Sequence, residues 1–303
     1  MTEHGSRSAC SPADWDEALG PDLLALLKKQ NLQLKSVERL VHLDAPAHLT
    51  DTFRLVSTAG NSFKARNALN EARAERIDYF LARLGKLAFP AVEARCGRSI
   101  LLQWISGEQL THDSACAQLE AAGRLLGKLH AQPIPPDCPY AAPADTAQAG
   151  ARIEQSLLKL KSADLLGRDT ADVILQVASD NQPARASSCI IHTDLCPDNL
   201  VLDAEGRLRS IDNESLQIGF SDLDLARSWY RWPLESNSGE AFLSGYTHHA
   251  DPAAFRKHFA FWFTAVLLES IVYRLESPSG AWNTPLTRLN NFAREPESEL
   301  PDD

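Results

Sequence analysis

The chain has 303 residues, of which 44% are hydrophobic and 23% are charged. This length and composition are typical of a folded protein with one large core or two smaller ones, and they exclude a disordered chain. The formal net charge of −10, without any basic cluster, argues against nucleic acid as a partner and is compatible with a small cationic substrate.

The sequence shows no sign of membrane attachment or secretion. The most apolar window, 259–275, contains Glu269 and Arg274 and therefore predicts a buried helix. The first residues lack the apolar segment of a signal peptide. The six cysteines form no CxxC pair, which is typical of free thiols in a reducing compartment. We therefore expect a cytoplasmic protein without membrane contact.

A small α+β region is predicted for the first hundred residues, where residues 15–30 favour one or two short helices. Apolar alternation and turn residues predict strands at 34–43, 51–58, 62–66, 89–95 and 99–105. The segment 69–85 has apolar residues at helical spacing and ends in a glycine, so it predicts a helix between the third and fourth strands.

The rest of the chain is predicted to be mainly helical. Helices are predicted at 114–132, 151–167 and 169–179, and again from Asp222 onward. The string GRLLGK at 123–128 superficially resembles a phosphate-binding loop, but it is one residue short and lies within a helix, so it predicts helix packing. We place the domain boundary so that it divides the chain into residues 1–105 and 106–303.

The stretch HTDLCPDNLVLDAEGRLRSIDNE, residues 192–214, contains a predicted β-hairpin with strands at 200–203 and 208–212. Asn199 precedes the first strand and Asp212 ends the second, so both are expected at the open end of the hairpin. An amide oxygen and a carboxylate at one place are hard ligands that suit Mg²⁺ and do not suit zinc.

Asp194 lies on the loop before this hairpin, and Pro197 disfavours a helical conformation there. A carboxylate beside a magnesium–nucleotide site is what phosphoryl transfer to a hydroxyl requires, because it orients and deprotonates the acceptor. Each residue alone is common in turns, but the ordered set at fixed spacing favours a functional site. That set consists of His192, Asp194, Asn199 and Asp212.

This stretch resembles the catalytic loop and metal aspartate of the aminoglycoside phosphotransferase and choline kinase-like superfamily, whose members are small-molecule kinases related in fold to protein kinases. The family pattern is roughly H-G-D-x-x-x-x-N, followed by I-D-[WFY]-E. The resemblance implies that Asp194 is the catalytic base and that His192 braces the loop. It also implies that Asn199 and Asp212 are the magnesium ligands.

The sequence departs from the usual family residues in three places. Thr193 stands where glycine is usual, Pro197 and Asp198 precede the asparagine, and Asn213 stands where an aromatic residue is common. None of these changes removes a chemical group that the reaction needs. Asp198 is a candidate for contact with the acceptor, and Glu214 is a candidate for bracing the site.

Three further segments extend the resemblance over most of the chain. LLQWISGEQL at 101–110 resembles the family's hinge, which implies that the backbone of Gln103, Trp104 and Ile105 meets the adenine. GRLLGKLH resembles the helix that follows the hinge. GFSDLDLARSW resembles a segment whose aspartate, here Asp224, is structural.

The phosphates of the nucleotide need a cation from the third predicted strand, where Lys64 and Arg66 share one face. We expect Lys64 to hold the phosphates, with Arg66 as the close alternative. A carboxylate partner is expected on the following helix, with Glu75 as the first choice and Glu71 as the alternative. The loop at 44–52 should cover the phosphates, although it contains no glycine.

The resemblance implies a bilobal, protein-kinase-like α+β fold. The small N-terminal lobe would contain an antiparallel sheet and one helix, and the larger C-terminal lobe would be mainly helical. The implied activity is ATP-dependent transfer of the γ-phosphate to a hydroxyl of a small molecule in the cleft between the lobes, with Mg²⁺ as cofactor and GTP left open. The acceptor is expected between the Asp194 loop and the helices after residue 222. An aminoglycoside, an amino alcohol, an amino acid or a sugar would each fit.

Two alternative functions make different predictions. A catalytically inactive nucleotide-binding module would have lost the base or a metal ligand, and none is lost. A protein kinase would have an activation segment that ends in A-P-E after Asp212, and this sequence has none.

Overall fold

The structure is a computed structural model, and it describes residues 6–41, 51–85, 87–140, 145–232, 234, 236–277 and 280–295. Contacts divide the chain into two compact units of two segments each. The first unit comprises Met1–Glu108 and Val201–Glu214, and the second comprises Gln109–Leu200 and Ser215–Asp303. The hairpin segment therefore belongs with the N-terminal part of the chain. The boundary between residues 105 and 106, as the division between a nucleotide-binding lobe and a lobe with the catalytic loop, stays a prediction.

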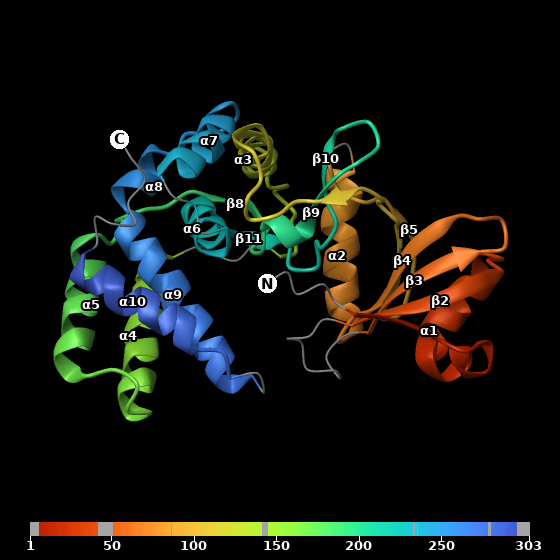
Figure 1. Cartoon of the computed structure of the whole chain (residues 1–303), viewed down its shortest axis with the longest axis horizontal. Coiled ribbons are helices and arrows are strands. Elements are labelled where there is room, and N and C mark those ends of the chain that lie inside the picture. Colours follow the sequence, from red (N-terminus) through yellow and green to blue (C-terminus); the bar gives the residue numbers. More distant parts are fainter. Residues whose placement is uncertain are drawn as a thin grey trace. The chain divides into compact units, whose positions relative to one another are not determined.

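The first unit is built on a six-stranded antiparallel sheet with the strand order β1-β2-β3-β4-β6-β5 (Figure 1). Its strands are β1 (Ser6–Ala9), β2 (Leu34–Val41), β3 (Asp51–Ser57), β4 (Ser62–Asn67), β5 (Val92–Cys96) and β6 (Ser99–Gln103). The last five correspond to the five predicted strands. Strand β1 was not predicted because its sequence, SRSA, has no apolar alternation; its pairing with β2 places it in the sheet.

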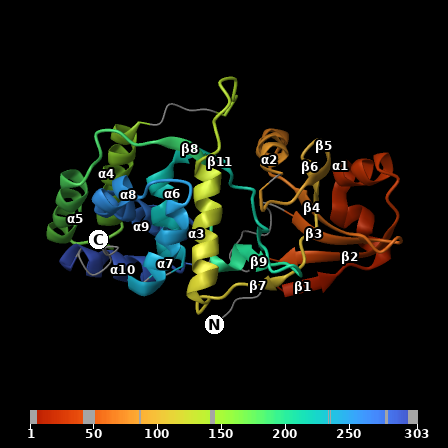
Figure 2. The ribbon, with the colours of Figure 1, turned by 90° about the horizontal axis from the view of Figure 1, so that it is seen from above.

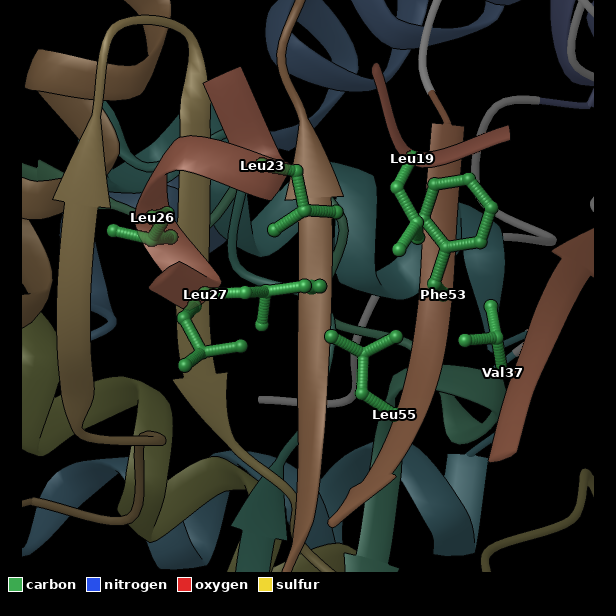
Figure 3. Close-up of a cluster of buried hydrophobic side chains, with 9 residues drawn as sticks. Leu19, Leu23, Leu26, Leu27, Val37, Phe53 and Leu55 are labelled. Carbon is green, nitrogen blue, oxygen red and sulfur yellow. The ribbon is translucent and has the colours of Figure 1, made fainter. Parts of the chain in front are cut away.

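Helix α1 (Trp15–Lys29) covers one face of this sheet, after a 3-10 turn at Pro12–Asp14 (Figure 3). The helix is kinked at Gly20, whose φ of 73° lies in the left-handed region that glycine adopts without strain. The leucines of α1 recur at helical spacing and pack on apolar side chains of β2 and β3. The labelled members of this cluster are Leu19, Leu23, Leu26, Leu27, Val37, Phe53 and Leu55. Each fully buried side chain of this kind contributes roughly 2 kcal/mol to stability.

Helix α2 (Glu71–Leu84) follows β4 and is capped by Asn70, whose side chain accepts a hydrogen bond of 2.9 Å from the backbone N–H of Arg73. Strand β4 separates its apolar and cationic residues by alternation. Ala65 belongs to the cluster under α1, so Lys64 and Arg66 lie on the opposite face of the sheet.

The predicted hairpin is present as β9 (Leu200–Leu202) and β10 (Leu208–Ser210), and β9 also pairs with β7 (Glu108–Gln109). Gly206 has a φ of 70° in the turn. The carboxylate of Asp203 accepts hydrogen bonds from the backbone N–H groups of Glu205 at 3.1 Å and Arg207 at 2.9 Å. The turn is therefore set by local hydrogen bonds.

The second unit is mainly helical. Its helices are α3 (Cys116–His130), α4 (Thr146–Ser162), α5 (Arg168–Asp180), α6 (Ser221–Arg231), α7 (Ser236–Thr247), α8 (Ala253–Lys257), α9 (Phe259–Glu276) and α10 (Asn283–Arg294). The most apolar of them, α9, is buried from Phe259 to Leu268, which confirms the predicted core helix. The rings of Phe259 and Phe263 stack with centroids 4.8 Å apart, and Phe292 of α10 meets both edge-on. No helix in the described ranges is both long and apolar enough to cross a membrane.

A two-stranded antiparallel ladder joins β8 (Ser188–Ile191) to β11 (Gln217–Phe220). Strand β11 was not predicted, since it is short and contains Gly219. The missing Cβ at Gly219 makes room for the side chain of Ile191, because a methyl group there would overlap it. This ladder positions the residues that follow β8.

Helices α3 and α7 lie side by side in both views (Figures 1 and 2), and their backbones approach closely at glycines. A methyl group on Gly123 would overlap the carbonyl of Phe242, and one on Gly245 would overlap the carbonyl of Glu120. The string GRLLGK is therefore a helix-packing motif, as predicted, and does not bind phosphate through a loop.

Candidate active site

Residues 192–199, which follow β8 and are called the Asp194 loop below, are held at their start by a buried aspartate. Asp224 of α6 is fully buried, and its carboxylate accepts hydrogen bonds of 2.7 Å from the backbone N–H groups of both His192 and Thr193. Nε2 of His130 lies 3.0 Å from the same carboxylate. Burial alone acts to raise the pKa of Asp224, but the interactions with His130 and His192 lower it below its ordinary value. Asp224 is therefore an ionised anchor for the loop backbone.

Thr193 has a φ of 69°, in the left-handed region that disfavours residues with a Cβ. Its hydroxyl lies 3.5 Å from the carbonyl oxygen of Ser215, a long and weak hydrogen bond. The glycine that is usual at this position of the family pattern thus has a physical reason here: the backbone must turn left-handed between His192 and Asp194.

The side chain of Asp194 is 41% exposed, whereas its surroundings are fixed. Nδ2 of Asn199 donates to the main-chain oxygen of Asp194 at 2.9 Å and to Oδ2 of its carboxylate at 3.0 Å. The backbone N–H of Asp194 donates to Nδ1 of His192 at 3.3 Å, and His192 is fully buried. Side chains therefore accept from the backbone N–H groups of three consecutive residues, 192 to 194, so the loop presents its carboxylate in one orientation.

Arg231, at the end of α6, also contacts the Asp194 loop. Its Nε lies 3.0 Å from Oδ1 of Asp194, and its Nη2 donates to Sγ of Cys196 at 3.4 Å. Burial acts to lower the pKa of Arg231, but Asp194 and Cys196 raise it above its usual value. Burial and the charge of Asp194 raise the pKa of Cys196 to about 12. The Cys196 thiol is therefore protonated at neutral pH and is unsuited to act as a nucleophile.

In the first unit, Lys64 and Arg66 meet two carboxylates at the end of the hairpin segment. Nζ of Lys64 donates to the Ile211 carbonyl at 2.9 Å, and lies 3.1 Å from Oδ1 of Asp212 and 3.4 Å from Oε1 of Glu214. Arg66 forms a close ion pair with Glu214, and its Nη1 lies 3.9 Å from Oδ1 of Asp212. Both predicted phosphate cations therefore lie beside the predicted metal ligand Asp212.

Burial changes the pKa values of the two cations in this cluster. It lowers the pKa of Lys64, against the opposing effect of Asp212, and it lowers the pKa of Arg66 to about 10. Arg66 thus stays charged at neutral pH although its side chain is only 7% exposed. A second source of negative charge, such as a phosphate group, would stabilise both cations electrostatically.

In this structure the carboxylates of α2 contact a cation of β5, and the role of Glu75 or Glu71 as partner of the β4 cations stays a prediction. Glu75 and Glu71 lie 3.5 Å and 3.6 Å from guanidinium nitrogens of Arg95, on β5, and their side chains are 48% and 64% exposed. The carboxylates that meet the β4 cations are instead those of Asp212 and Glu214. Arg66 is buried and Lys64 is partly buried where the hairpin segment ends, whereas the start of α2 faces the cation of β5.

Strand β6 ends at Gln103, whose backbone N–H donates to the carbonyl of Ala91 at 2.9 Å. Trp104 and Ile105 follow beyond the sheet ladder, and the guanidinium of Arg54 lies over the Trp104 ring at 4.9 Å from its centroid. The proposed contact of Gln103, Trp104 and Ile105 with adenine stays a prediction. Most of the loop at 44–52 lies outside the described residues.

The side chains proposed as metal ligands have the right chemistry for Mg²⁺. Asn199 uses both hydrogen bonds from its amide nitrogen on Asp194, which directs its amide oxygen elsewhere. Asp212 contributes a carboxylate that is 23% exposed. Within the part of the chain that the structure describes, no three His, Cys, Asp or Glu residues form a metal cage. Amide and carboxylate oxygens are ligands that Mg²⁺ prefers, and the role of Asn199 and Asp212 as metal ligands stays a prediction.

Sequence reasoning missed two contributors to these clusters. Arg231 lies in the string WYRWP, whose aromatic residues indicate only a packed core, so nothing local marks its contact with Asp194. Tyr246, whose hydroxyl lies 2.8 Å from Nδ1 of His130, comes from α7 and carries no motif at all. The free state of all six cysteines was predicted and is confirmed.

Comparison with known proteins gives concordant results. The model of a family described as the phosphotransferase enzyme family matches residues 48–258. An aminoglycoside 3'-phosphotransferase from Streptomyces ribosidificus is 27% identical over 203 residues, which cover 60% of this chain and 75% of that protein.

Solved structures show the same fold. A macrolide 2'-phosphotransferase type I matches with a TM-score of 0.67 at 16% identity, covering 98% of this chain and 99% of its own. A choline kinase from Cryptosporidium parvum Iowa II matches with a TM-score of 0.62 at 13% identity, covering 88% and 91% of the two chains. These likenesses confirm the predicted protein-kinase-like α+β fold, with an antiparallel sheet in the N-terminal region and a mainly helical remainder.

Proposed function

Since the chain belongs to the phosphotransferase enzyme family, and is thus an enzyme that transfers phosphoryl groups to hydroxyls of small molecules, we propose that it uses Mg-ATP to phosphorylate an aminoglycoside-, amino-alcohol- or sugar-like acceptor. The observation that carries this proposal is the Asp194 loop. Its backbone is anchored by buried side chains, while the carboxylate of Asp194 stays open to solvent.

Asp194 would orient and deprotonate the acceptor hydroxyl. Each of its carboxylate oxygens already has one partner, Arg231 on Oδ1 and Asn199 on Oδ2. A carboxylate oxygen can accept more than one hydrogen bond, so an acceptor hydroxyl can still bind. The two existing contacts fix the plane of the carboxylate, and this positioning is a large part of the rate enhancement available in phosphoryl transfer.

Lys64 and Arg66 would bind the phosphates of the nucleotide, and Asn199 and Asp212 would hold Mg²⁺. When bound, the metal neutralises charge on the phosphates. The ion pairs of Lys64 with Asp212 and of Arg66 with Glu214 keep both cations ordered. The backbone at Gln103, Trp104 and Ile105 would bind adenine, and a backbone contact of this kind leaves GTP as an alternative donor.

The acceptor can be found by ³¹P NMR of the protein with Mg-ATP and pooled hydroxyl compounds. The pools would contain aminoglycosides, amino alcohols, sugars or hydroxy amino acids. A new phosphomonoester signal from one pool, in the wild type and not in Asp194→Ala, is expected. A matched control is Asp203→Asn, which removes a carboxylate charge from the hairpin turn and should leave the signal unchanged.

Nucleotide binding is measured separately by calorimetry. Asp194→Ala should bind Mg-ATP with nearly the wild-type affinity, whereas Asp212→Ala should lose the magnesium dependence of binding. Transfer that persists in Asp194→Ala would exclude Asp194 as the base. A wild type that binds neither Mg-ATP nor Mg-GTP would point to an inactive protein that has kept these residues and lost nucleotide binding.

A further inference from the structure

Tyr246 lies in the second unit on α7, and the close packing of α7 on α3 brings it to His130. A methyl group on Gly127 would come within 2.7 Å of the carbonyl oxygen of Tyr246, so only glycine permits this approach. The Tyr246 hydroxyl lies 2.8 Å from Nδ1 of His130, and the two rings meet edge-on with centroids 5.5 Å apart. Tyr246 is 1% exposed and the His130 side chain is 2% exposed, so water does not compete for this contact.

The ends of this chain of hydrogen bonds fix its direction. Burial raises the pKa of Tyr246, and nearby Cys189, Asp222 and Asp224 raise it further, so the hydroxyl stays protonated and can donate. Asp224 is ionised and can only accept. His130 lies between them, with Nδ1 toward the hydroxyl and Nε2 toward the carboxylate. The matching tautomer has a bare Nδ1, which accepts from Tyr246, and a protonated Nε2, which donates to Asp224.

The carboxylate at the end of this chain anchors the start of the Asp194 loop. The same Oδ2 that faces His130 accepts the backbone N–H of His192, and Oδ1 accepts that of Thr193. Thr193 has a strained left-handed backbone, and this conformation sets the direction of the side chain of Asp194, the next residue. Any rotation of the Asp224 carboxylate would therefore displace the backbone N–H groups of His192 and Thr193, and with them the backbone that carries Asp194.

We propose that Tyr246 is a positioning residue for phosphoryl transfer. Its hydroxyl donates to the bare Nδ1 of His130, and through His130 and Asp224 it holds the Asp194 loop in the orientation that catalysis needs. The catalytic part of this inference rests on the proposed function, whereas the hydrogen bond to Nδ1 and the hold on the loop do not. None of these residues is expected to touch the nucleotide or the acceptor.

The variant Tyr246→Phe removes one hydroxyl and keeps the ring, so the packing of α3 on α7 is preserved. The matched control is Tyr230→Phe, since the Tyr230 hydroxyl also takes part in a hydrogen bond of 2.8 Å, which it accepts from Oγ of Ser270 on α9. Both variants lose a tyrosine hydroxyl and a hydrogen bond of equal length. The Tyr246 hydroxyl belongs to the hydrogen bonds that lead through His130 to Asp224, whereas the Tyr230 hydroxyl bonds to Ser270.

Two measurements need no substrate. Long-range ¹H–¹⁵N NMR should show the Nε2–H tautomer of His130 in all three proteins, with the Nδ1 resonance shifted to higher frequency in Tyr246→Phe alone, because its bare Nδ1 has lost a hydrogen-bond donor. Hydrogen exchange of the Thr193 amide should become about tenfold faster in Tyr246→Phe alone, relative to the change in global unfolding. An unchanged Nδ1 resonance in Tyr246→Phe, or equal exchange in the two variants, would overturn the inference.

Kinetics with the acceptor found above provide the catalytic test. Tyr246→Phe should lower kcat roughly tenfold with KM nearly unchanged, the size expected for one lost buried hydrogen bond. The double variant Tyr246→Phe/His130→Gln should be no slower than His130→Gln, because both act through one path. Equal kcat in Tyr246→Phe and Tyr230→Phe would overturn the positioning role.

The two proposals fail separately. A wild type without transfer to any pool would count against the proposed function, and the Thr193 amide would still decide whether Tyr246 holds the loop. If the wild type is active and the Asp194 loop is unperturbed in Tyr246→Phe, the proposed function stands and the role of Tyr246 is refuted.

Discussion

Arg231 and Asp194 form an ion pair in which Nε of the guanidinium lies 3.0 Å from Oδ1 of the carboxylate. The same guanidinium donates to Sγ of Cys196, so it bridges two positions of one loop. The contact joins the end of α6 to the carboxylate proposed as the catalytic base. It gives that carboxylate a fixed plane without burying it.

Replacing Arg231 with Ala is expected to lower kcat by about tenfold to a hundredfold, because Asp194 would then be free to rotate. Arg231→Lys should restore only part of the loss, since an ammonium cannot donate along two directions from a planar group. Steady-state kinetics and Mg-ATP binding are the measurements. Affinity for Mg-ATP should stay near the wild-type value, and a large loss of affinity in Arg231→Ala would assign Arg231 to nucleotide binding instead.

The ion pairs of the β4 cations Lys64 and Arg66 with Asp212 and Glu214 give a second prediction, which concerns stability. Glu214→Gln should lower the free energy of unfolding by about 3 kcal/mol, because it leaves buried Arg66 without its nearest counter-charge. It should also weaken Mg-ATP binding, since the cations proposed to hold the phosphates lose their order. Urea unfolding and calorimetry measure the two effects.

Glu75→Gln is the matched control, because its carboxylate is half exposed and meets Arg95. It should change the unfolding free energy by no more than about 0.5 kcal/mol. If Glu75→Gln impaired nucleotide binding and Glu214→Gln did not, the partner expected from sequence would be the functional one after all.

The contacts around Asp194 and around the β4 cations show which parts of the site can be predicted from sequence and which cannot. The hairpin was predictable because alternation and a glycine turn are local, and residues 192 to 212 carry their chemistry at fixed spacing. Strands β2 to β6 were predictable for the same reason. Strand β1 and strand β11 were not, because four residues without a pattern become strands only when a partner pairs with them.

The carboxylates that contact Lys64 in this structure were not predicted as its partners, for a related reason. Helix α2 directly follows β4, so Glu75 is close in sequence, whereas Glu214 is 150 positions away along the chain from Lys64. Arg231 and Tyr246 likewise reach the Asp194 loop and its anchor only through helix packing. Residue type and spacing can predict a loop, but the side chains that orient it come from the tertiary fold.

The backbone of Thr193 gives a third prediction. A left-handed conformation costs a residue with a Cβ roughly 1–2 kcal/mol. Glycine has none of that strain, but its greater freedom in the unfolded chain costs roughly 0.4–1 kcal/mol. Thr193→Gly is therefore expected to raise the free energy of unfolding by about 0.5–1 kcal/mol.

Thr193→Val tests whether backbone strain is the cause. Valine keeps the branched Cβ and removes only the weak hydroxyl contact with Ser215. It should not stabilise the protein, and urea unfolding should rank the variants with Gly above Thr and Val. If Val stabilised as much as Gly, the hydroxyl and not the backbone would be the source of the effect.

The buried carboxylate of Asp224 gives a prediction about pH. Its pKa is lowered in the folded protein, so the folded state binds fewer protons than the unfolded state near the ordinary pKa of an aspartate, about 3.9. Its contribution to stability is thus fully present above the unfolded pKa and is lost as the pH falls through the lowered folded pKa. At pH 7 the variant Asp224→Asn should be less stable than the wild type by roughly 3 kcal/mol, since charged hydrogen bonds to two backbone N–H groups and to His130 are weakened.

This difference should shrink below about pH 4, because protonation makes Asp224 neutral like the asparagine that replaces it. Urea unfolding of both proteins at pH 7, 5, 4 and 3 measures it directly. A difference that stays constant over this range would mean that Asp224 is already protonated at neutral pH. The Asp194 loop would then be anchored by a neutral acid, and the direction assigned to the hydrogen bonds from Tyr246 through His130 would have to be reversed.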